Sequence, residues 1–305
     1  MPPPFVRVPF AELPARAAPH PFFRAPEARL PIALPDGGRS TVSLRRFGAG
    51  PPLLLLHGLM TTGYSWRRVI EPLSRRFTVL VPDLPGAGRT VGPEGPLPPA
   101  RVVDWLVALI DALELDHTSV IGNSMGGYLA LWLALRAPAR VERLLVVHAP
   151  GLPEHRLWAL RLALRLPGAV RLLRWMVQRE PRRWVWRNVH YWDEGQKSLE
   201  ELEEYGAPLA TAAGFEGFVR QLRDMMDPVE MQRFVALCGQ APPGLPPVHL
   251  LYTRRDPMVP PSLGPRLQRV VPRATLSFVE EGGHFLHVDR PEAFLAAVDA
   301  WAPRA

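Results

Sequence analysis

Runs rich in apolar residues alternate with amphipathic stretches along most of this chain. The runs lie at 52–56, 77–82, 118–121, 141–148, 248–252 and 275–279, and the stretches with helical spacing at 64–74, 100–115, 262–270 and 291–301. The runs have the composition of strands that are buried on both faces of a sheet. Alternation of such strands with helices across short loops predicts an α/β fold, with a mostly parallel central sheet flanked by helices.

The alternation stops near residue 150 and resumes near residue 239. The intervening segment is helical or irregular, and proline and glycine breakers divide it into several helices. The first 28 residues are rich in proline, which excludes regular helix, and carry phenylalanines that we expect to hold this arm on the body. The sequence therefore predicts a proline-rich arm at 1–28, a core made of 29–149 and 239–305, and a helical cap inserted at 150–238.

Residues 122–126 read Gly-Asn-Ser-Met-Gly, between a predicted strand and a predicted helix. A serine flanked by glycines two residues away on each side, at such a turn, is the pattern of a nucleophile elbow. The turn would strain the backbone at Ser124, and a side chain at either glycine would collide with neighbouring elements. The N–H of Met125 would lie at a helix N-terminus, whose partial positive charge can meet an oxyanion. The motif predicts that Ser124 is a nucleophile.

A serine hydroxyl needs a base that removes its proton and an acid that orients the base. Both should follow later strands, because loops converge at the carboxyl ends of the strands in an open α/β sheet. Asp256 follows the strand at 248–252, and His284 follows the strand at 275–279. The chain order Ser124, Asp256, His284 is the order expected for this kind of sheet.

Together these residues resemble the α/β-hydrolase fold superfamily, in its serine hydrolase branch with a helical cap. The motifs that carry the resemblance are Leu56-His57-Gly58, Asp83 to Gly88, the elbow, Asp256 to Pro260, and Gly283-His284. The resemblance implies a catalytic triad of Ser124, Asp256 and His284. It also implies oxyanion-hole amides at Leu59 and Met125, and neither a metal nor an organic cofactor. Dehalogenases and epoxide hydrolases of this fold carry aspartate at the elbow, so the serine implies attack on carbonyls through an acyl-enzyme.

Four other residues compete for these roles. His287 follows the predicted base by three residues, and we expect it in packing or at the rim that faces the cap. His57 resembles a buried loop anchor of the family, and His148, at a strand end, is expected in the core or in the lining of the pocket. Asp83 lies in a loop rich in proline and glycine that resembles a structural loop of the family, which leaves Asp256 as the acid.

Composition and charge limit the partners and the cellular location that we expect for this protein. The net charge is +7, and every basic residue other than Lys197 is an arginine, but we find no nucleic-acid-binding motif and expect no such partner. No apolar stretch reaches the roughly 20 residues that a membrane span requires. The N-terminal residues lack a secretion-signal pattern, and the single Cys238 excludes an internal disulfide framework. A cytoplasmic location is therefore expected.

The predicted substrate site lies between the core loops and the cap. Loop residues near the predicted triad are largely apolar, as ligand pockets tend to be; they include Met60, Met258, Val259 and Phe285. We expect a small-molecule ester with an apolar acyl or alcohol part, cleaved by a carboxylesterase or lipase-like enzyme.

Several alternatives to an esterase stay open. Residues 122–127 also resemble carbon–carbon bond hydrolases of the meta-cleavage-product type, although residues 59–62 are less glycine-rich than the oxyanion loop of those enzymes. Lactonase, thioesterase, acyltransferase and haloperoxidase-like activities are compatible with the same residues, and so is a binding protein built on the fold. The cap arginines are expected to form a solvated face. An alternative puts the helices from Arg156 to Arg179, where leucines and arginines mix, on an anionic membrane surface.

Overall fold

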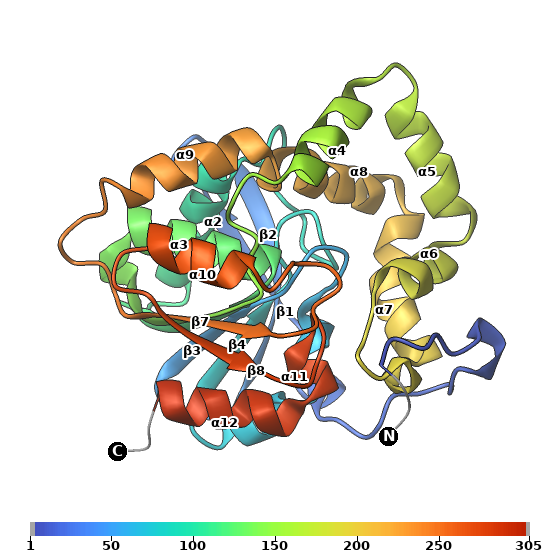
Figure 1. Cartoon of the computed structure of the whole chain (residues 1–305), viewed down its shortest axis with the longest axis horizontal. Coiled ribbons are helices and arrows are strands. Elements are labelled where there is room, and N and C mark those ends of the chain that lie inside the picture. The colour runs from blue at the N-terminus through green and yellow to red at the C-terminus, as the bar shows by residue number, and fades with distance from the viewer. Residues whose placement is uncertain (1–3, 303–305) are drawn as a thin grey trace.

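Eight strands form one sheet in the order β1-β2-β4-β3-β5-β6-β7-β8 (Figure 1). The computed structural model describes residues 4–302. β1 pairs antiparallel with β2 and β2 antiparallel with β4, whereas the other neighbours are parallel. The strands are β1 (Ala28–Ala33), β2 (Arg39–Phe47), β3 (Pro52–Leu56), β4 (Thr78–Pro82), β5 (Thr118–Asn123), β6 (Val141–Val147), β7 (Val248–Thr253) and β8 (Thr275–Val279). The predicted mostly parallel sheet is confirmed.

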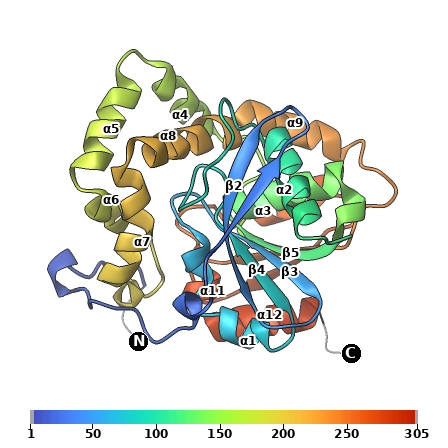
Figure 2. The same ribbon diagram turned by 180° about the vertical axis from the view of Figure 1, so that it is seen from behind.

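Helices cover both faces of the sheet, and the strands supply an apolar side chain to each face in turn. In β3, Leu54 and Leu56 join the hydrophobic cluster under α2, α3, α9 and α10, while Leu53 and Leu55 join the cluster under α1, α11 and α12 (Figures 1 and 2). This two-sided burial explains the unbroken apolar run at 52–56. The core helices are α1 (Ile70–Ser74), α2 (Pro99–Ala112), α3 (Met125–Arg136), α9 (Pro228–Cys238), α10 (Leu263–Val270), α11 (Leu286–Asp289) and α12 (Pro291–Trp301).

The segment at 64–74, predicted as one helix, is two short pieces. A 3-10 turn, η3, covers Gly63–Trp66, and α1 begins only at Ile70. Pro72 explains the break, because in a continuous helix its ring would clash with the carbonyl four residues earlier and it could donate no hydrogen bond.

The helical elements from α4 to η6, between β6 and β7, stand beyond the carboxyl ends of the strands and form the cap (Figure 1). They are α4 (His155–Arg165), α5 (Ala169–Arg179), α6 (Pro181–Asn188), α7 (Leu199–Ala210), α8 (Ala212–Arg220) and η6 (Gln221–Met225), with the short turn η5 (Glu194–Gln196) between α6 and α7. The predicted insertion at 150–238 also contains α9. This helix packs on α3, where the Phe234 ring lies 5.5 Å from Tyr128 and 6.1 Å from Trp132. Within residues 4–302, no helix is long and apolar enough to cross a bilayer.

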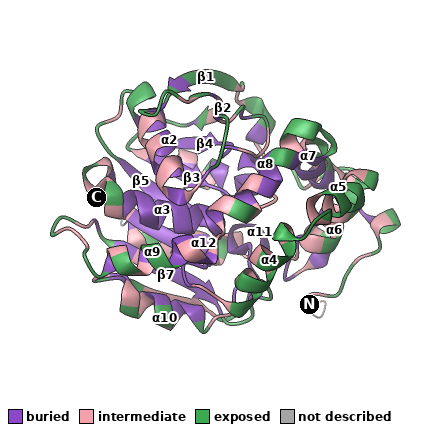
Figure 3. Cartoon of the chain, turned by 90° about the horizontal axis from the view of Figure 1, so that it is seen from above, coloured by how far each residue is buried: buried purple, intermediate pink, exposed green. Residues whose placement is uncertain are grey.

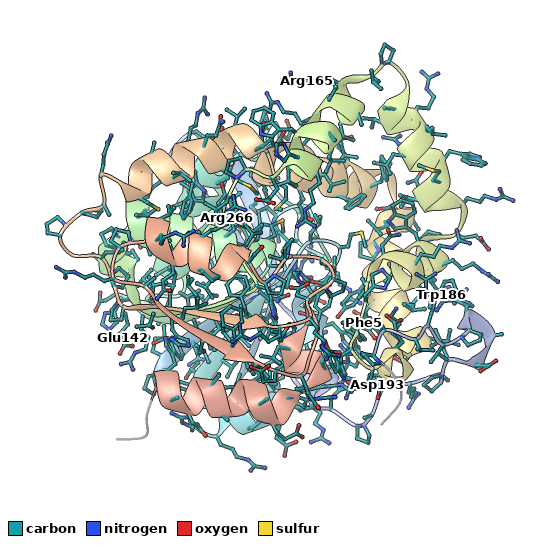
Figure 4. All side chains as sticks on the ribbon, in the orientation of Figure 1. Phe5, Glu142, Arg165, Trp186, Asp193 and Arg266 are labelled. Atoms are coloured by element: carbon teal, nitrogen blue, oxygen red, sulfur yellow. The ribbon has the colours of Figure 1, made fainter. Side chains whose placement is uncertain are left out.

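The N-terminal arm lies across both cap and core; its first three residues are outside the described part of the chain. It contains two 3-10 turns, η1 (Phe10–Glu12) and η2 (Phe22–Arg24). On the cap side, the Phe5 N–H donates to the carbonyl of Trp192 at 2.9 Å, and the Trp186 indole N–H donates to the Val8 carbonyl at 3.0 Å (Figure 4). On the core side, the buried Phe22 ring lies 5.3 Å from Tyr64.

A buried ion pair also joins the cap to the core. Arg67, which follows η3, and Glu201 of α7 are both about 1% exposed, and Nη2 and Oε2 lie 3.2 Å apart. Arg67 also lies over the Tyr64 ring, and the hydroxyl of Tyr191 donates to Glu201. Burial by itself would lower the pKa of Arg67, but Glu201 raises it well above its ordinary value, so this side chain is charged. The cap is therefore held by charge as well as by apolar contacts.

Candidate active site

The chain turns sharply at Ser124, between β5 and α3. Its backbone has φ 53° and ψ −121°, and its N–H donates to the Val147 carbonyl at 2.7 Å. A Cβ at Gly122 would lie 2.5 Å from the Gly126 carbonyl oxygen, and a Cβ at Gly126 would lie 2.3 Å from the Leu56 oxygen. The turn thus has the strained serine and the close backbone approach expected of a nucleophile elbow.

Adding one methyl group at this turn should destabilise the protein. We expect Gly126→Ala to lower the free energy of unfolding by about 1–3 kcal/mol, because the new Cβ forces β3 and α3 apart. Gly244→Ala is the matched control, since a Cβ there meets no atom within 4 Å. Urea unfolding measures both variants; equal midpoints for the two would contradict the close approach of α3 to β3.

The predicted acid and base form a hydrogen-bonded pair. Nδ1 of His284 lies 2.7 Å from Oδ2 of Asp256, and both residues are buried. Oδ1 of Asp256 accepts the backbone N–H groups of Met258 at 2.7 Å and Val259 at 2.9 Å. Burial alone would raise the pKa of Asp256, but the nearby histidines and these hydrogen bonds hold it below its ordinary value. An ionised Asp256 can only accept, so Nδ1 of His284 carries the proton and Nε2 is left as the base.

The elbow and the histidine loop are joined through Asn123. Its side-chain amide donates to the His284 carbonyl at 3.0 Å, so the residue before Ser124 holds the backbone of the predicted base. A Cβ at Gly58 would lie 3.3 Å from the Ser124 Cβ, which shows that the loop after β3 meets the elbow as well. Ser124 is 8% exposed. The structure thus brings the loops of Ser124, Asp256 and His284 to one edge of the sheet.

The predicted oxyanion donors belong to two segments that meet at Ser124. Met125 is the first residue of α3, so its N–H has no partner within the helix. Leu59 is half-buried and follows Gly58, which lies against the elbow. Two peptide N–H groups from these two segments are the usual components of an oxyanion hole in this kind of site.

The four predicted pocket residues divide into two groups. Met60 and Met258 are half-buried against the hydrophobic cluster that contains cap residues, and Phe285 is buried with its ring 5.4 Å from Tyr191 of the cap. Val259, in contrast, belongs to the cluster between the sheet and α3. Met60, Met258 and Phe285 therefore face the cap, while Val259 supports the Asp256 loop from the core side.

Comparison with known proteins agrees with this geometry. Residues 51–291 match the model of the family described as alpha/beta hydrolase fold. The chain belongs to this family. It is 30% identical over 276 residues to 2-hydroxy-6-oxo-2,4-heptadienoate hydrolase of Pseudomonas putida, covering 86% of this chain and 92% of the relative. It is 27% identical over 271 residues to the pimeloyl-[acyl-carrier protein] methyl ester esterase of Aeromonas hydrophila, covering 85% and 98%. A thermophilic esterase from Thermogutta terrifontis shares the fold, with a TM-score of 0.72, 21% identity and coverage of 91% and 98%.

In this α/β hydrolase, two cavities lie next to the predicted oxyanion loop. A cavity of about 20 Å³ lies between Met60 and the residues of α7 and α8, among them Leu209 and Phe218. A larger cavity of about 370 Å³ shares Thr62 and Gly88 with it and continues along α7. Neither of these two cavities is lined by Ser124 or His284.

His57 of the hydrolase is held by hydrogen bonds between loops, and His287 is held by ring stacking in the core. The His57 ring joins two loops, since Nε2 accepts the Leu84 N–H at 2.9 Å and Nδ1 lies 2.8 Å from the Gly58 oxygen. His287 is fully buried and stacks on Trp66 with 4.1 Å between ring centroids. Burial lowers the pKa of both histidines, so both are neutral. The packing role expected for His287 and the anchor role expected for His57 agree with these contacts.

Asp83 likewise holds a loop. One carboxylate oxygen accepts the Gly63 N–H at 2.9 Å, and the other accepts the Arg89 N–H at 2.9 Å. Both carboxylate oxygens thereby accept within the loops after β3 and β4, in keeping with the structural part expected for this residue.

His148 lies in the core directly beside the predicted triad. Its Nε2 accepts the Thr253 N–H at 2.8 Å and lies 3.9 Å from Oδ2 of Asp256, and its ring centroid is 5.5 Å from that of His284. Burial lowers the pKa of His148 to about 4, so the ring is neutral near pH 7. A neutral ring here packs beside the acid–base pair without competing for its proton.

The neutral state of His148 makes stability depend on pH. Between its ordinary pKa of 6.5 and its folded pKa of about 4, the unfolded chain binds a proton at His148 and the folded chain does not. Stability therefore falls as pH falls through this window, by up to about 1.4 kcal/mol per pH unit for one such proton. We expect His148→Gln, which keeps an acceptor for the Thr253 N–H, to flatten this slope.

Urea unfolding at pH 6.5, 5.5 and 4.5 measures the slope. His155→Gln, at an exposed position of α4, is the control and should leave it unchanged. An identical slope in the wild type and His148→Gln would show that His148 does not titrate as its burial requires.

Two residues near the site escaped the sequence analysis. Asn123 holds the His284 carbonyl, and its place beside the nucleophile in the elbow motif was the available signal. Asp289 accepts the Gly283 N–H at 2.8 Å and the Trp192 N–H at 2.7 Å, so it joins the histidine loop to the cap. Burial raises the pKa of Asp289 to about 7. Nothing in the spacing of the sequence signals the contact between Asp289 and Trp192, because Trp192 lies in the cap.

Proposed function

We propose that this α/β hydrolase is a serine carboxylic ester hydrolase that acts through an acyl-enzyme. The observation that carries the proposal is the buried Asp256–His284 pair, with 2.7 Å between Oδ2 and Nδ1. This pair leaves Nε2 of His284 as a base, and Asn123 ties the same loop to the elbow that holds Ser124. A serine so placed can be activated for attack on a carbonyl carbon.

The proposed reaction has two halves. Nε2 of His284 takes the Ser124 proton while Oγ bonds to the carbonyl carbon, and the amides of Leu59 and Met125 stabilise the oxyanion. Each such donor contributes on the order of 3 kcal/mol to lowering the barrier. Collapse of the intermediate breaks the ester C–O bond, and the imidazolium gives its proton to the departing alcohol. A water molecule, activated in the same way, then hydrolyses the acyl-enzyme and releases the acid.

The surroundings of the site favour an uncharged, apolar substrate. Met60, Met258 and Phe285, on the cap side of the site, are apolar. Among the described residues, Arg67 and Lys197 are the basic side chains with about 1% exposure, and each is paired with a buried glutamate. A cation that already has a carboxylate partner is a poor partner for a substrate carboxylate, because the protein's own acid competes for it.

A second candidate is hydrolysis of a carbon–carbon bond. It is favoured by the 30% identity to the Pseudomonas putida relative, whose name gives a dienoate, and therefore a carboxylate, as its substrate. The esterase from Aeromonas hydrophila, at 27% identity, supports the first candidate. The two reactions can use the same serine, base and oxyanion donors, and they differ in the bond that breaks, C–O in an ester and C–C in the second candidate.

The experiment is a panel of p-nitrophenyl esters of graded acyl length, run beside Ser124→Ala and beside a 2-hydroxy-6-oxo-dienoate. We expect turnover of short and medium esters by the wild type alone. Turnover of the dienoate without turnover of any ester would replace the first candidate with the second. Equal, slow hydrolysis of every ester by wild type and variant would remove the ester proposal.

A further inference from the structure

The α4–α5 hairpin of the cap exposes large apolar side chains. It projects from the molecule, with α4 rising to the tip and α5 descending from it, and its helices are largely exposed (Figures 1 and 3). The exposed apolar residues are Trp158 at 38%, Leu162 at 66%, Leu166 at 58%, Leu172 at 56%, Trp175 at 58% and Met176 at 41%. Of the nine large apolar residues that are most exposed in the described chain, these six lie in one stretch of 19 residues.

These side chains form a second apolar face on each helix. α5 already buries Val177 and packs Leu173 against the rest of the cap, and α4 packs Leu157 against the core. An amphipathic helix at a protein surface needs only one such face, so the outward-facing residues are not explained by the packing of the cap. Contiguous exposed apolar surface of this kind marks an interaction site.

The charge of the same hairpin is entirely positive. Residues 155–179 contain no aspartate or glutamate, and they contain the arginines 156, 161, 165, 171, 174 and 179. Two of them have carboxylate partners elsewhere in the cap region, Arg161 with Asp227 and Arg174 with Glu216. Within the described chain, the other four have no carboxylate at ion-pair distance, although Arg179 lies over the Trp175 ring. Arg165 lies at the tip of the hairpin (Figure 4).

The order of residues from the tip outward matches the layers of a lipid surface. Leu166, in the turn, is nearest the tip, with Leu162 and Leu172 about one turn away along each helix. Trp158 and Trp175 lie seven or eight residues from the turn at 166–168, which is about 10–12 Å along either helix. Leucine at the deepest level, with tryptophan at the level of the headgroups, is the arrangement of segments that lie in a membrane interface. Arg165 and Arg171 stand beside these leucines, and their long side chains can extend to the headgroup phosphates.

We propose that the α4–α5 hairpin docks this hydrolase on an anionic lipid bilayer. The apolar residues enter the boundary between headgroups and acyl chains, and the arginines without a carboxylate partner contact lipid phosphates. A second copy of the chain is a poorer occupant, because two hairpins of the same positive charge would repel each other. The docking is independent of the hydrolytic reaction, since no residue of the hairpin belongs to the predicted triad.

The test is co-sedimentation of the full chain with vesicles of phosphatidylcholine alone or with phosphatidylglycerol. We expect binding to the anionic vesicles, at least tenfold stronger than to the neutral ones, because the negative surface potential attracts arginines close to the bilayer. Arg165→Glu/Arg171→Glu should weaken anionic binding at least tenfold, and Leu162→Ser/Leu166→Ser/Trp175→Ser should do the same. All these positions are exposed, so the fold should be kept, and turnover of a soluble ester should be unchanged.

Matched controls separate docking from general charge or hydrophobicity. Arg136→Glu/Arg269→Glu makes the same change in net charge at exposed positions of the core, and Val91→Ser removes an exposed apolar side chain from a core loop. Both controls should bind like the wild type. Equal loss in the hairpin and control variants, or equal binding to both kinds of vesicle, would overturn the proposal. So would a dimer in light scattering that only the apolar hairpin variant dissociates.

Discussion

Replacing Ser124 with alanine should lower kcat for the best ester by on the order of 10⁴-fold or more, with little change in stability. The hydroxyl is the only atom lost, and without it no acyl-enzyme can form. Asp256→Asn should lower kcat to a similar degree, because an amide in place of the carboxylate can hold His284 in the wrong tautomer. Initial rates at saturating ester and labelling by a fluorophosphonate probe measure both effects.

Ser65→Ala is the matched control for this loss. Ser65 is as buried as a core residue, lies in η3 and is not part of the predicted machinery. It should retain activity and labelling, while folded Ser124→Ala should lose both. A Ser124→Ala protein that still turns over the ester at the wild-type rate would require a different nucleophile.

Replacing Arg67 with methionine should lower the free energy of unfolding by about 3–5 kcal/mol, because it leaves the Glu201 carboxylate buried without a counter-charge. Arg67 and Glu201 come from the core and the cap, so the variant should also loosen the cap. Urea unfolding gives the first effect, and hydrogen exchange of the α7 amides gives the second.

The double variant Arg67→Met/Glu201→Leu decides whether the loss comes from the stranded charge. Removal of both partners of a buried ion pair is often neutral or stabilising, so much of the lost stability should return. Arg75→Met is the control, because its ion pair with Glu71 is solvent-exposed and should contribute less than about 1 kcal/mol. A double variant no more stable than Arg67→Met would mean that packing, not charge, dominates at this interface.

The central strands were predictable because burial on both faces favours apolar residues, as in β3, where Leu53 to Leu56 are all buried. The run at 118–121 became β5 over Thr118–Asn123, and that at 275–279 became β8 over the same residues. Helix limits were less predictable where a proline stood inside the periodic stretch, as Pro72 does in α1. The position of α9 could not be read from the sequence, because an amphipathic helix carries no mark of which surface it will cover.

The candidate site divides in the same way. Asp256 and His284 could be predicted because strand order brings the loops after β7 and β8 to the edge that holds Ser124. The contacts of His148 and Asp289 could not, because each depends on how a loop approaches a residue far away in the chain. His148 meets Thr253 across 105 positions, and Asp289 meets Trp192 across 97.

Residues 5–25 of the N-terminal arm form a strap between the cap and the core, and this strap limits which caps can be exchanged between members of the family. Its contacts with Trp186 and Trp192 at one end, and with Tyr64 at the other, make the chain's beginning a structural partner of its middle. A cap taken from another member of the family would lack the surface that contacts this strap. Chimeras that swap the strap and the cap together should fold where those that swap the cap alone do not.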